Sequence, residues 1–461
     1  MSSSCFKTGE GKKVKVMALT LTLIFSTVVL GFAGASHKPA RSENWLEIKN
    51  GIYTLHLGGS YYDMGYAHGM LLRGQVREVV DAYIDYAERH GLTFVEQLEL
   101  YEKAESSIPQ GYRDEMEGLA HGSGVDLEKI HAIHAIPMEF HCSGLLAYGE
   151  ATVDGGLYHT RSLDYSLNIQ DPQTGRKLQE NSMITVYEPD GGLAWLNVGW
   201  AGWIGCLGGM NEAGISVGEM GSSSDDETFN GLPMVFRLRR VMEETMCLSQ
   251  ALAIMQENRT CGYNFLVGDS RTGDARAVEQ TAHGFYAGAW DDEVEGRYPH
   301  WQIMGVVRRT NHFISDLSQT QRQHQLSLEE ISAIRQFLLL RGGDLGLDVG
   351  DIEYLCDKFD YRDDGRLPHL HFVSYALQST SLEKSSGGID GEAIGEVMRR
   401  SYRVFNDFIE LAGSSVDSLH QLVFAPLSGD FWVSNAGRES SAYMEPLYHF
   451  NFYELMSGPP S

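Results

Sequence analysis

The stretch from Cys142 to Asp164 reads CSGLLAYGEATVDGGLYHTRSLD, and it marks a change in the character of the sequence. Before it, apolar residues recur mostly at the spacing of helical faces, whereas after it they occur in short runs separated by turn signals. Within the stretch, Asp154-Gly155-Gly156 is typical of a turn between two antiparallel strands. The sequence therefore predicts a β-hairpin that begins at a cysteine, where a helical section meets a β-rich section.

The section upstream of Cys142 is predicted to be mostly helical. Apolar residues recur on one helical face between 62 and 89, and Asp126 is a suitable N-cap for a helix that Pro137 ends. Downstream, strands are expected at 183–188, 193–198, 214–219, 263–268, 275–279, 421–425 and 431–435. Helices are expected at 235–245, 249–257, 327–340 and 392–411. Because strands outnumber helices and the helices come in pairs, the pattern favours a layered α+β domain over a doubly wound parallel sheet.

The composition is that of a globular protein with a large core. The chain has 461 residues, of which 43% are hydrophobic and 21% charged, which excludes the disordered, collagen-like and small disulfide-rich classes. Lys and Arg total 36 against 62 Asp and Glu, a formal net charge of −26. A surface this acidic repels phosphate backbones, so no nucleic-acid partner is expected.

The first 35 residues have the pattern of an export signal. Lys12, Lys13 and Lys15 precede the uncharged run 16–35, which ends in Ala33-Gly34-Ala35. We expect cleavage after Ala35 and a secreted, periplasmic or luminal protein. An uncleaved signal that anchors the chain in a membrane is the alternative, because 20 residues can span a bilayer. No membrane span is expected in the mature chain.

Several chemically suggestive residues are assigned ordinary roles. Removing residues 1–35 leaves five cysteines, an odd number that predicts an unpaired thiol; the pairing of Cys206, Cys247, Cys261 and Cys356 is left open. Gly214-Ile215-Ser216-Val217-Gly218 fits the G-x-S-x-G pattern of serine hydrolases, but no helix is predicted directly after the serine. Two pairs of closely spaced histidines lack the further ligands of a zinc motif. We expect no metal and no cofactor.

The strongest candidates for chemistry surround the predicted hairpin. The hairpin begins at Cys142 and its second strand ends in Arg161-Ser162-Leu163-Asp164, while Asn211 and Asn311 lie in separate downstream turns. Taken singly, each has an ordinary explanation: a buried thiol, a surface ion pair, or a turn residue. Their combination in this order is what favours an enzyme.

These residues also carry a resemblance. The stretch 142–164 resembles N-terminal-nucleophile hydrolases of the choloylglycine hydrolase superfamily, most closely the acyl-coenzyme A:6-aminopenicillanate acyltransferase group. The upstream segment 59–69, GSYYDMGYAHG, resembles the part that precedes the nucleophile in that group and in phospholipase B-like proteins. The resemblance implies a four-layer αββα fold in which the chain cuts itself between His141 and Cys142. It also implies that a mostly helical fragment, 36–141, stays with the catalytic domain, 142–461.

The resemblance further implies a role for each candidate residue. Cys142 becomes a nucleophile whose own α-amine, with an ordinary pKa of about 7.7–8.0, acts as general base. Arg161 beside the sulfur favours thiolate, and Asp164 orients the amine. The resemblance also implies that Asn211 and Asn311 contact the oxyanion or the substrate. It implies a second arginine at the site, for which Arg322 is the candidate.

The expected function is that of an exported, autoproteolytic cysteine amidohydrolase or acyltransferase. It would act on a non-peptide linear amide through an acyl-cysteine thioester, so its expected partner is a small-molecule acyl amide or acyl donor. One alternative is a phospholipase B-like or ceramidase-like lipid acyl hydrolase with the same nucleophile. An alternative of another class is an inactive binding protein with the same fold. The acyl donor, the acceptor and the oligomeric state are left open.

Overall fold

The structure is a computed structural model that describes residues 44–135, 141–322, 325–360, 369–411 and 417–458. The predicted export signal and the residues just before His141 lie outside the described residues. Among the helices that are described, none combines the length and the apolar character needed to cross a lipid bilayer.

The section upstream of Cys142 begins with two strands and continues as helices. The strands are β1 (Trp45–Lys49) and β2 (Ile52–Gly59), and the α-helices are α1 (Tyr61–Leu71), α2 (Arg73–Arg89), α3 (Phe94–Ala104), α4 (Gln110–Ser123) and α5 (Leu127–Ala135). Strand β2 pairs in parallel with β5 (Ser182–Pro189), which lies beyond Cys142. The section is therefore mostly helical, as predicted, but it also supplies two strands to a sheet that the downstream section completes.

Helices α1 and α4 approach each other very closely, and glycines make this possible. A Cβ atom on Gly65 would lie 2.0 Å from the carbonyl oxygen of Glu115, and one on Gly122 would lie 2.2 Å from that of Tyr66. Both distances are far shorter than the contact distance of about 3.5–4.0 Å between non-bonded atoms. Larger side chains would force the helices apart, which is a physical reason for the glycine spacing within 59–69.

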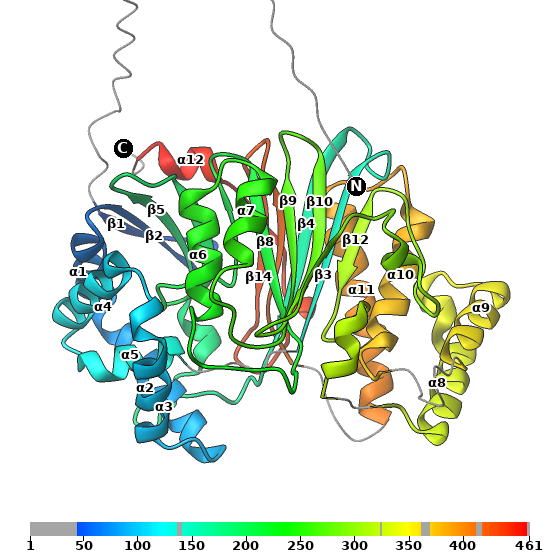
Figure 1. Ribbon diagram of the computed structural model, residues 1–461, viewed down its shortest axis with the longest axis horizontal. Coiled ribbons are helices and arrows are strands. Elements are labelled where there is room, and N and C mark those ends of the chain that lie inside the picture. The colour runs from blue at the N-terminus through cyan, green and yellow to red at the C-terminus, as the bar shows by residue number, and fades with distance from the viewer. Residues whose placement is uncertain (1–43, 136–140, 323–324, 361–368, 412–416, 459–461) are drawn as a thin grey trace, which may run out of the picture. The chain divides into compact units, whose positions relative to one another are not determined.

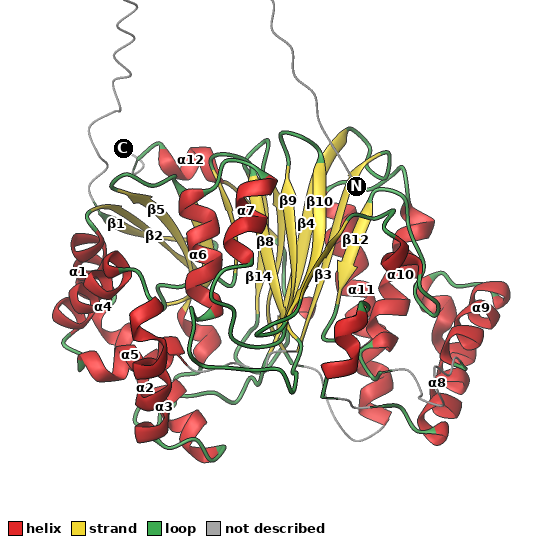
Figure 2. Cartoon of the chain, in the orientation of Figure 1, coloured by secondary structure: helices red, strands yellow, loops and turns green. Residues whose placement is uncertain are grey.

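The remaining strands complete two sheets (Figure 2). Their bounds are β3 (His141–Gly149), β4 (Gly155–Asp164), β6 (Trp195–Trp200), β7 (Gly208–Asn211), β8 (Ile215–Gly221), β9 (Tyr263–Asp269), β10 (Asp274–Gln280), β11 (Phe285–Gly288), β12 (Val306–Arg309), β13 (Ser418–Ala425), β14 (Asp430–Asn435) and β15 (Tyr448–Asn451). The larger sheet has the order β1-β2-β5-β6-β7-β8-β9-β10-β11, and the smaller has the order β12-β3-β4-β13-β14-β15. Every downstream strand predicted above overlaps an observed strand, and the predicted hairpin is the β3–β4 pair.

Helices cover the outer face of each sheet. Helices α6 (Met234–Glu244) and α7 (Leu248–Met255) lie against β7, β8 and β9. Helices α10 (Phe372–Ser385) and α11 (Gly391–Leu411) lie against the six-stranded sheet, and β3 and β4 pack against β8 and β9 across the centre. The order helix, sheet, sheet, helix (Figure 1) confirms the predicted αββα fold. Helices α8 (Leu328–Arg341), α9 (Val349–Phe359) and α12 (Phe452–Met456) complete the α-helices of the described residues.

A buried ion network joins the helices upstream of Cys142 to the section downstream of it. Arg239 of α6 is fully buried; its Nη2 donates to Glu115 of α4 at 2.6 Å and its Nε donates to Glu243 at 2.8 Å. The hydroxyls of Tyr61 and Tyr112 donate to Glu243 at 3.0 and 2.9 Å. Charges at such depth require full pairing and hydrogen bonding. The network therefore ties the upstream helices to the downstream section by contacts that do not depend on an intact chain.

We expect Arg239→Met to lower the free energy of unfolding by about 3–5 kcal/mol, because it leaves two buried carboxylates without their cation. The neighbouring Arg240 supplies a matched control, since it is partly exposed and pairs with Glu244 and Glu257 at the surface. Arg240→Met should cost less than about 1 kcal/mol. Urea denaturation of both variants measures the difference, and equal losses would contradict the importance of the buried network.

Candidate functional site

Cys142 is the second residue of β3, and its side chain is 2% exposed. In the hairpin register Cys142 pairs with Leu163, and Gly144 pairs with Arg161. Because alternate residues of a strand share a face, Cys142, Gly144 and Arg161 all point toward the nine-stranded sheet. The position of Gly144 fits this direction, since a Cβ atom there would lie 2.8 Å from the sulfur of Met220 on β8. The hairpin thus holds a thiol and a guanidinium together between the two sheets.

The guanidinium of Arg161 lies beside the thiol, as the resemblance implies. Its Nη2 donates to Cys142 Sγ at 3.5 Å, and its Nε donates to the carbonyl oxygen of Glu219 at 2.7 Å. Burial raises the pKa of the Cys142 thiol well above its ordinary range, and the charge of Arg161 offsets part of that rise. At neutral pH the sulfur is therefore in its protonated thiol form in this structure.

Glu219 is part of the site, and sequence reasoning missed it. Its side chain is fully buried on β8, where one carboxylate oxygen accepts from Arg161 Nη2. The other oxygen, Oε1, has no hydrogen-bond partner among the described residues. Burial raises the pKa of Glu219, and Arg161 opposes that rise. The signal that could have found it is a single carboxylate in an apolar strand, because a buried arginine such as Arg161 requires an anionic partner.

Asp164 lies at the end of β4, directly opposite His141 in the hairpin register. Its position in the strand turns its carboxylate toward the outer helices, away from the face that carries the sulfur. There it accepts hydrogen bonds from Ser162 Oγ at 2.8 Å and from the hydroxyl of Tyr402. Burial raises the pKa of Asp164 to about 7, although these hydrogen bonds favour the ionised form. The structure therefore places a titratable carboxylate next to the bond expected to be cut.

Asn311 follows β12 and joins the start of β3 to the end of β8. Its Oδ1 accepts from the backbone N–H of Cys142 at 2.7 Å, and its Nδ2 donates to the carbonyl oxygen of Gly221 at 2.7 Å. Asn264 fixes the loop by donating to the carbonyls on both sides of Asn311, those of Thr310 and His312, at 2.7 and 2.8 Å. The amide of Asn311 is therefore held in one orientation at the nitrogen of Cys142.

Two residues that the resemblance assigns to the site, Asn211 and Arg322, do not lie beside Cys142. Asn211 is the last residue of β7, where its Nδ2 donates to the carbonyls of Met242 and Thr245 at 2.9 Å. Its Oδ1 accepts from two backbone N–H groups at the β7–β8 turn. Strand β8 runs from this turn to Gly221, so Asn211 and Asn311 lie at opposite ends of it. The structure gives Asn211 a turn-capping role and does not bring it to the cysteine.

Arg322 is exposed and pairs with Asp225 and Glu227 at 3.2 and 3.0 Å. No hydrogen bond or ion pair joins it to the described side chains of Cys142, Arg161 or Asp164. Its guanidinium is held by carboxylates of the 225–227 loop, so it lies outside the buried group formed by Cys142, Arg161 and Glu219.

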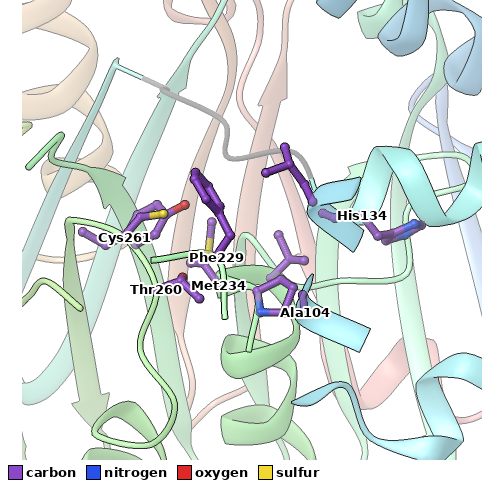
Figure 3. Close-up of a pocket in the computed structure, with 11 residues that line it drawn as sticks. Ala104, His134, Phe229, Met234, Thr260 and Cys261 are labelled. Carbon is purple, nitrogen blue, oxygen red and sulfur yellow. The ribbon is translucent and has the colours of Figure 1, made fainter. Parts of the chain in front are cut away.

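A small pocket lies between the end of α5 and the start of β9 (Figure 3). Its volume is about 30 Å³, and its lining is mainly apolar. The lining residues are Leu100, Ala104, His134, Ala135, Phe229, Pro233, Met234, Val235, Thr260, Cys261 and Tyr263. Tyr263 is the register partner of Gly221, whose carbonyl accepts from Asn311. The pocket therefore lies between upstream helices and the downstream section, next to the strand ends that carry the site.

The structure also places the serine, cysteine and histidine patterns of the sequence. Ser216 is the second residue of β8 and lies 3.0 Å from the ring of His159, with no helix directly after it. The five cysteines that the structure describes are all free. Within the described ranges, no three His, Cys, Asp or Glu side chains are grouped so that they could hold a metal ion.

Comparison with known proteins confirms the resemblance. Residues 174–336 match the family model described as acyl-coenzyme A:6-aminopenicillanic acid acyl-transferase. This range contains Asn211, Asn311 and Arg322, and it begins after Cys142, Arg161 and Asp164.

Two curated relatives come from Dictyostelium discoideum. Protein dcd1B is 29% identical over 260 residues, which cover 50% of this chain and 50% of the relative. Protein dcd1A is 28% identical over 281 residues, which cover 53% of this chain and 61% of the relative. The chain thus spans about half to three fifths of the length of these relatives. Among solved structures, a Caenorhabditis elegans N-acylethanolamine-hydrolyzing acid amidase ortholog is 14% identical, with a TM-score of 0.34 over 62% of this chain and 93% of that one.

Proposed function

We propose that this chain, which is similar over residues 174–336 to the acyl-coenzyme A:6-aminopenicillanic acid acyl-transferase family, is an exported, self-processing amidohydrolase or acyltransferase. Cys142 is its nucleophile, and its substrate is a non-peptide linear amide. One observation carries the proposal. At the start of β3, the sulfur of Cys142 contacts the guanidinium of Arg161. The backbone N–H of Cys142 donates to the side-chain oxygen of Asn311.

The first step of the proposed mechanism cuts the chain. The sulfur of Cys142 attacks the carbonyl carbon of His141, the C–N bond between the two residues breaks, and the thiol proton moves to the nitrogen that departs. Water then hydrolyses the thioester, which releases a carboxylate on His141 and a free thiol on Cys142. The product is an N-terminal cysteine whose α-amine has a pKa near neutrality. The position of Asp164 opposite His141 supports this step, because a carboxylate there can orient the groups that exchange the proton.

The second stage is turnover. The α-amine of Cys142 accepts the thiol proton, and the sulfur attacks the acyl carbon of the substrate. Asn311 Nδ2 donates one of its two hydrogens to the developing oxyanion, which it can stabilise without changing its own charge. The leaving amine takes the proton from the α-amine, and an acyl-cysteine thioester remains. Water or an acceptor amine then attacks the thioester, which gives hydrolysis or acyl transfer.

The residues that line the pocket beside Tyr263 are mainly apolar, which favours a substrate with an apolar acyl group whose chain extends beyond a cavity of only about 30 Å³. Within that volume Leu100, Phe229 and Met234 can bury about one methyl or methylene group, which stabilises binding by about 0.8 kcal/mol. The same observation favours the second candidate, a lipid acyl hydrolase that uses the same nucleophile on a lipid amide or ester.

The proposal is tested with the purified, processed protein and a panel of linear acyl amides of graded chain length. We expect release of the amine and, after rapid acid quenching, an acyl adduct on the fragment that begins at Cys142. Cys247→Ala is a suitable control, because that cysteine lies at the start of α7, away from the cluster, and the adduct should persist. Absence of both adduct and amine release across the panel, in a correctly folded protein, would favour the binding-protein alternative.

A further inference from the structure

The outer helix α11 reaches the site through one side chain. Tyr402 is 3% exposed, and its hydroxyl donates to Asp164 Oδ2. Its oxygen also lies 3.1 Å from the Oγ of Ser143, the residue that follows Cys142. One phenol therefore contacts both strands of the hairpin at its open end, close to the bond between His141 and Cys142.

The hydrogen bonds around Asp164 fix both of its carboxylate oxygens. Tyr402 takes Oδ2, and Ser162 Oγ donates to Oδ1 at 2.8 Å. Ser162 Oγ itself lies 3.0 Å from Ser418 Oγ on β13. Because Ser143 and Asp164 face the helices while Cys142 faces the other sheet, Tyr402 reaches Oδ2 from the helical layer, on the side away from the sulfur.

We propose that Tyr402 is a positioning residue that holds the Asp164 carboxylate oriented beside the bond that is cut, so that helix α11 takes part in self-processing. The inference rests on the proposed function, because it concerns the same cut. Tyr402 does not contact the reacting sulfur. It acts through Asp164 and through Ser143.

The groups around Asp164 determine in which direction its pKa changes when the Tyr402 hydroxyl is removed. The groups that contact the carboxylate are Tyr402 from α11, Ser162 from β4 and Ser418 from β13, and the charge of Arg161 acts on it from the other face of β4. Burial raises the pKa of Asp164 to about 7, and the hydrogen bond from Tyr402 lowers it. Removing the hydroxyl raises that pKa further, so the carboxylate becomes protonated at a higher pH. If the ionised carboxylate is the form that supports cutting, the acid limb of the pH–rate profile moves upward.

The experiment follows self-cleavage of freshly synthesised full-length chain between pH 5 and 9 by intact-mass measurement. Tyr402→Phe is expected to shift the acid limb upward by about one pH unit, which is the scale of one hydrogen bond to a charged group. At pH 6 this shift corresponds to a rate about tenfold lower. Tyr375→Phe is the matched control, because Tyr375 is a buried phenol of the same helical layer whose hydroxyl has no hydrogen-bond partner among the described residues. It should reproduce the wild-type profile.

A second variant should move the acid limb of the pH–rate profile in the opposite direction. A fluorinated tyrosine at position 402 is a stronger hydrogen-bond donor, and it should move the acid limb to lower pH without removing the ring. The inference is overturned if the acid limb of Tyr402→Phe coincides with that of the wild type, if Tyr375→Phe shifts it equally, or if the fluorinated residue shifts it upward. A wild-type chain that is never cut at any pH overturns the proposed function itself, which is a different result.

Discussion

Cys142→Ala is expected to remain a single chain and to lose all turnover, whereas the wild-type protein is expected to separate into fragments 36–141 and 142–461. The substitution removes the thiol that contacts Arg161 on the residue whose backbone N–H donates to the amide of Asn311. Without it neither the self-cleavage nor the acyl thioester can form. Intact-mass measurement under denaturing conditions decides the first part, and amine release from an acyl amide decides the second.

The control for this experiment is another buried cysteine. Cys206 is fully buried, and burial likewise raises the pKa of its thiol. Cys206→Ala should be cut and should turn over as the wild type does. Cys142→Ser should be cut slowly and should lose most turnover, because a hydroxyl is much less nucleophilic than a thiol at neutral pH. An uncut wild-type chain that is fully active would contradict the α-amine mechanism.

The predicted elements that the structure confirms are those with local signals. The helix expected at 327–340 is observed as α8, because Ser327 and Glu330 form a capping box that fixes its start. The hairpin from Cys142 is confirmed because its turn residues and alternating strands are both local. Such features depend on neighbours within a few residues, and the sequence displays them directly.

Helix α10 was not predicted, and its burial explains why. Its residues are buried on every face, including Ser379 and Thr380, so no apolar stripe of helical period exists. The hydroxyls of these residues donate to the carbonyls four positions earlier, those of Tyr375 and Ala376, at 2.6 and 3.0 Å. A polar side chain satisfied within its own helix can be buried, but in the sequence it resembles a surface residue.

The site was only partly predictable for a related reason. Arg161 and Asp164 lie on the predicted hairpin, and their positions relative to Cys142 follow from strand register. Tyr402 lies 238 residues from Asp164 in the sequence, and Glu219 lies on a strand of the other sheet. Contacts of this kind depend on how the layers pack, and no local pattern encodes them.

The two asparagines show where a local pattern is ambiguous. Both lie in turns, and a turn asparagine can either satisfy backbone groups or present its amide to a site. Asn211 caps its own turn and the end of α6 through four hydrogen bonds. Asn311 instead accepts from the nitrogen of Cys142, and Asn264 holds its loop from both sides. Because the two asparagines have different hydrogen-bond partners, replacing each of them tests whether Asn311 is the oxyanion donor.

We expect Asn311→Ala to lower kcat of the processed protein about 10²–10³-fold with a smaller change in KM, the pattern of an interaction made mainly in the transition state. Asn211→Ala should instead lower the free energy of unfolding, because it leaves buried backbone groups unsatisfied, while kcat per folded molecule stays near that of the wild type. Steady-state kinetics on an acyl amide, with the folded fraction fixed by urea denaturation, separates the two effects. If Asn311→Ala kept its kcat and Asn211→Ala lost it, the oxyanion donor would lie at the other end of β8, and the assignment of the site around Cys142 would be wrong.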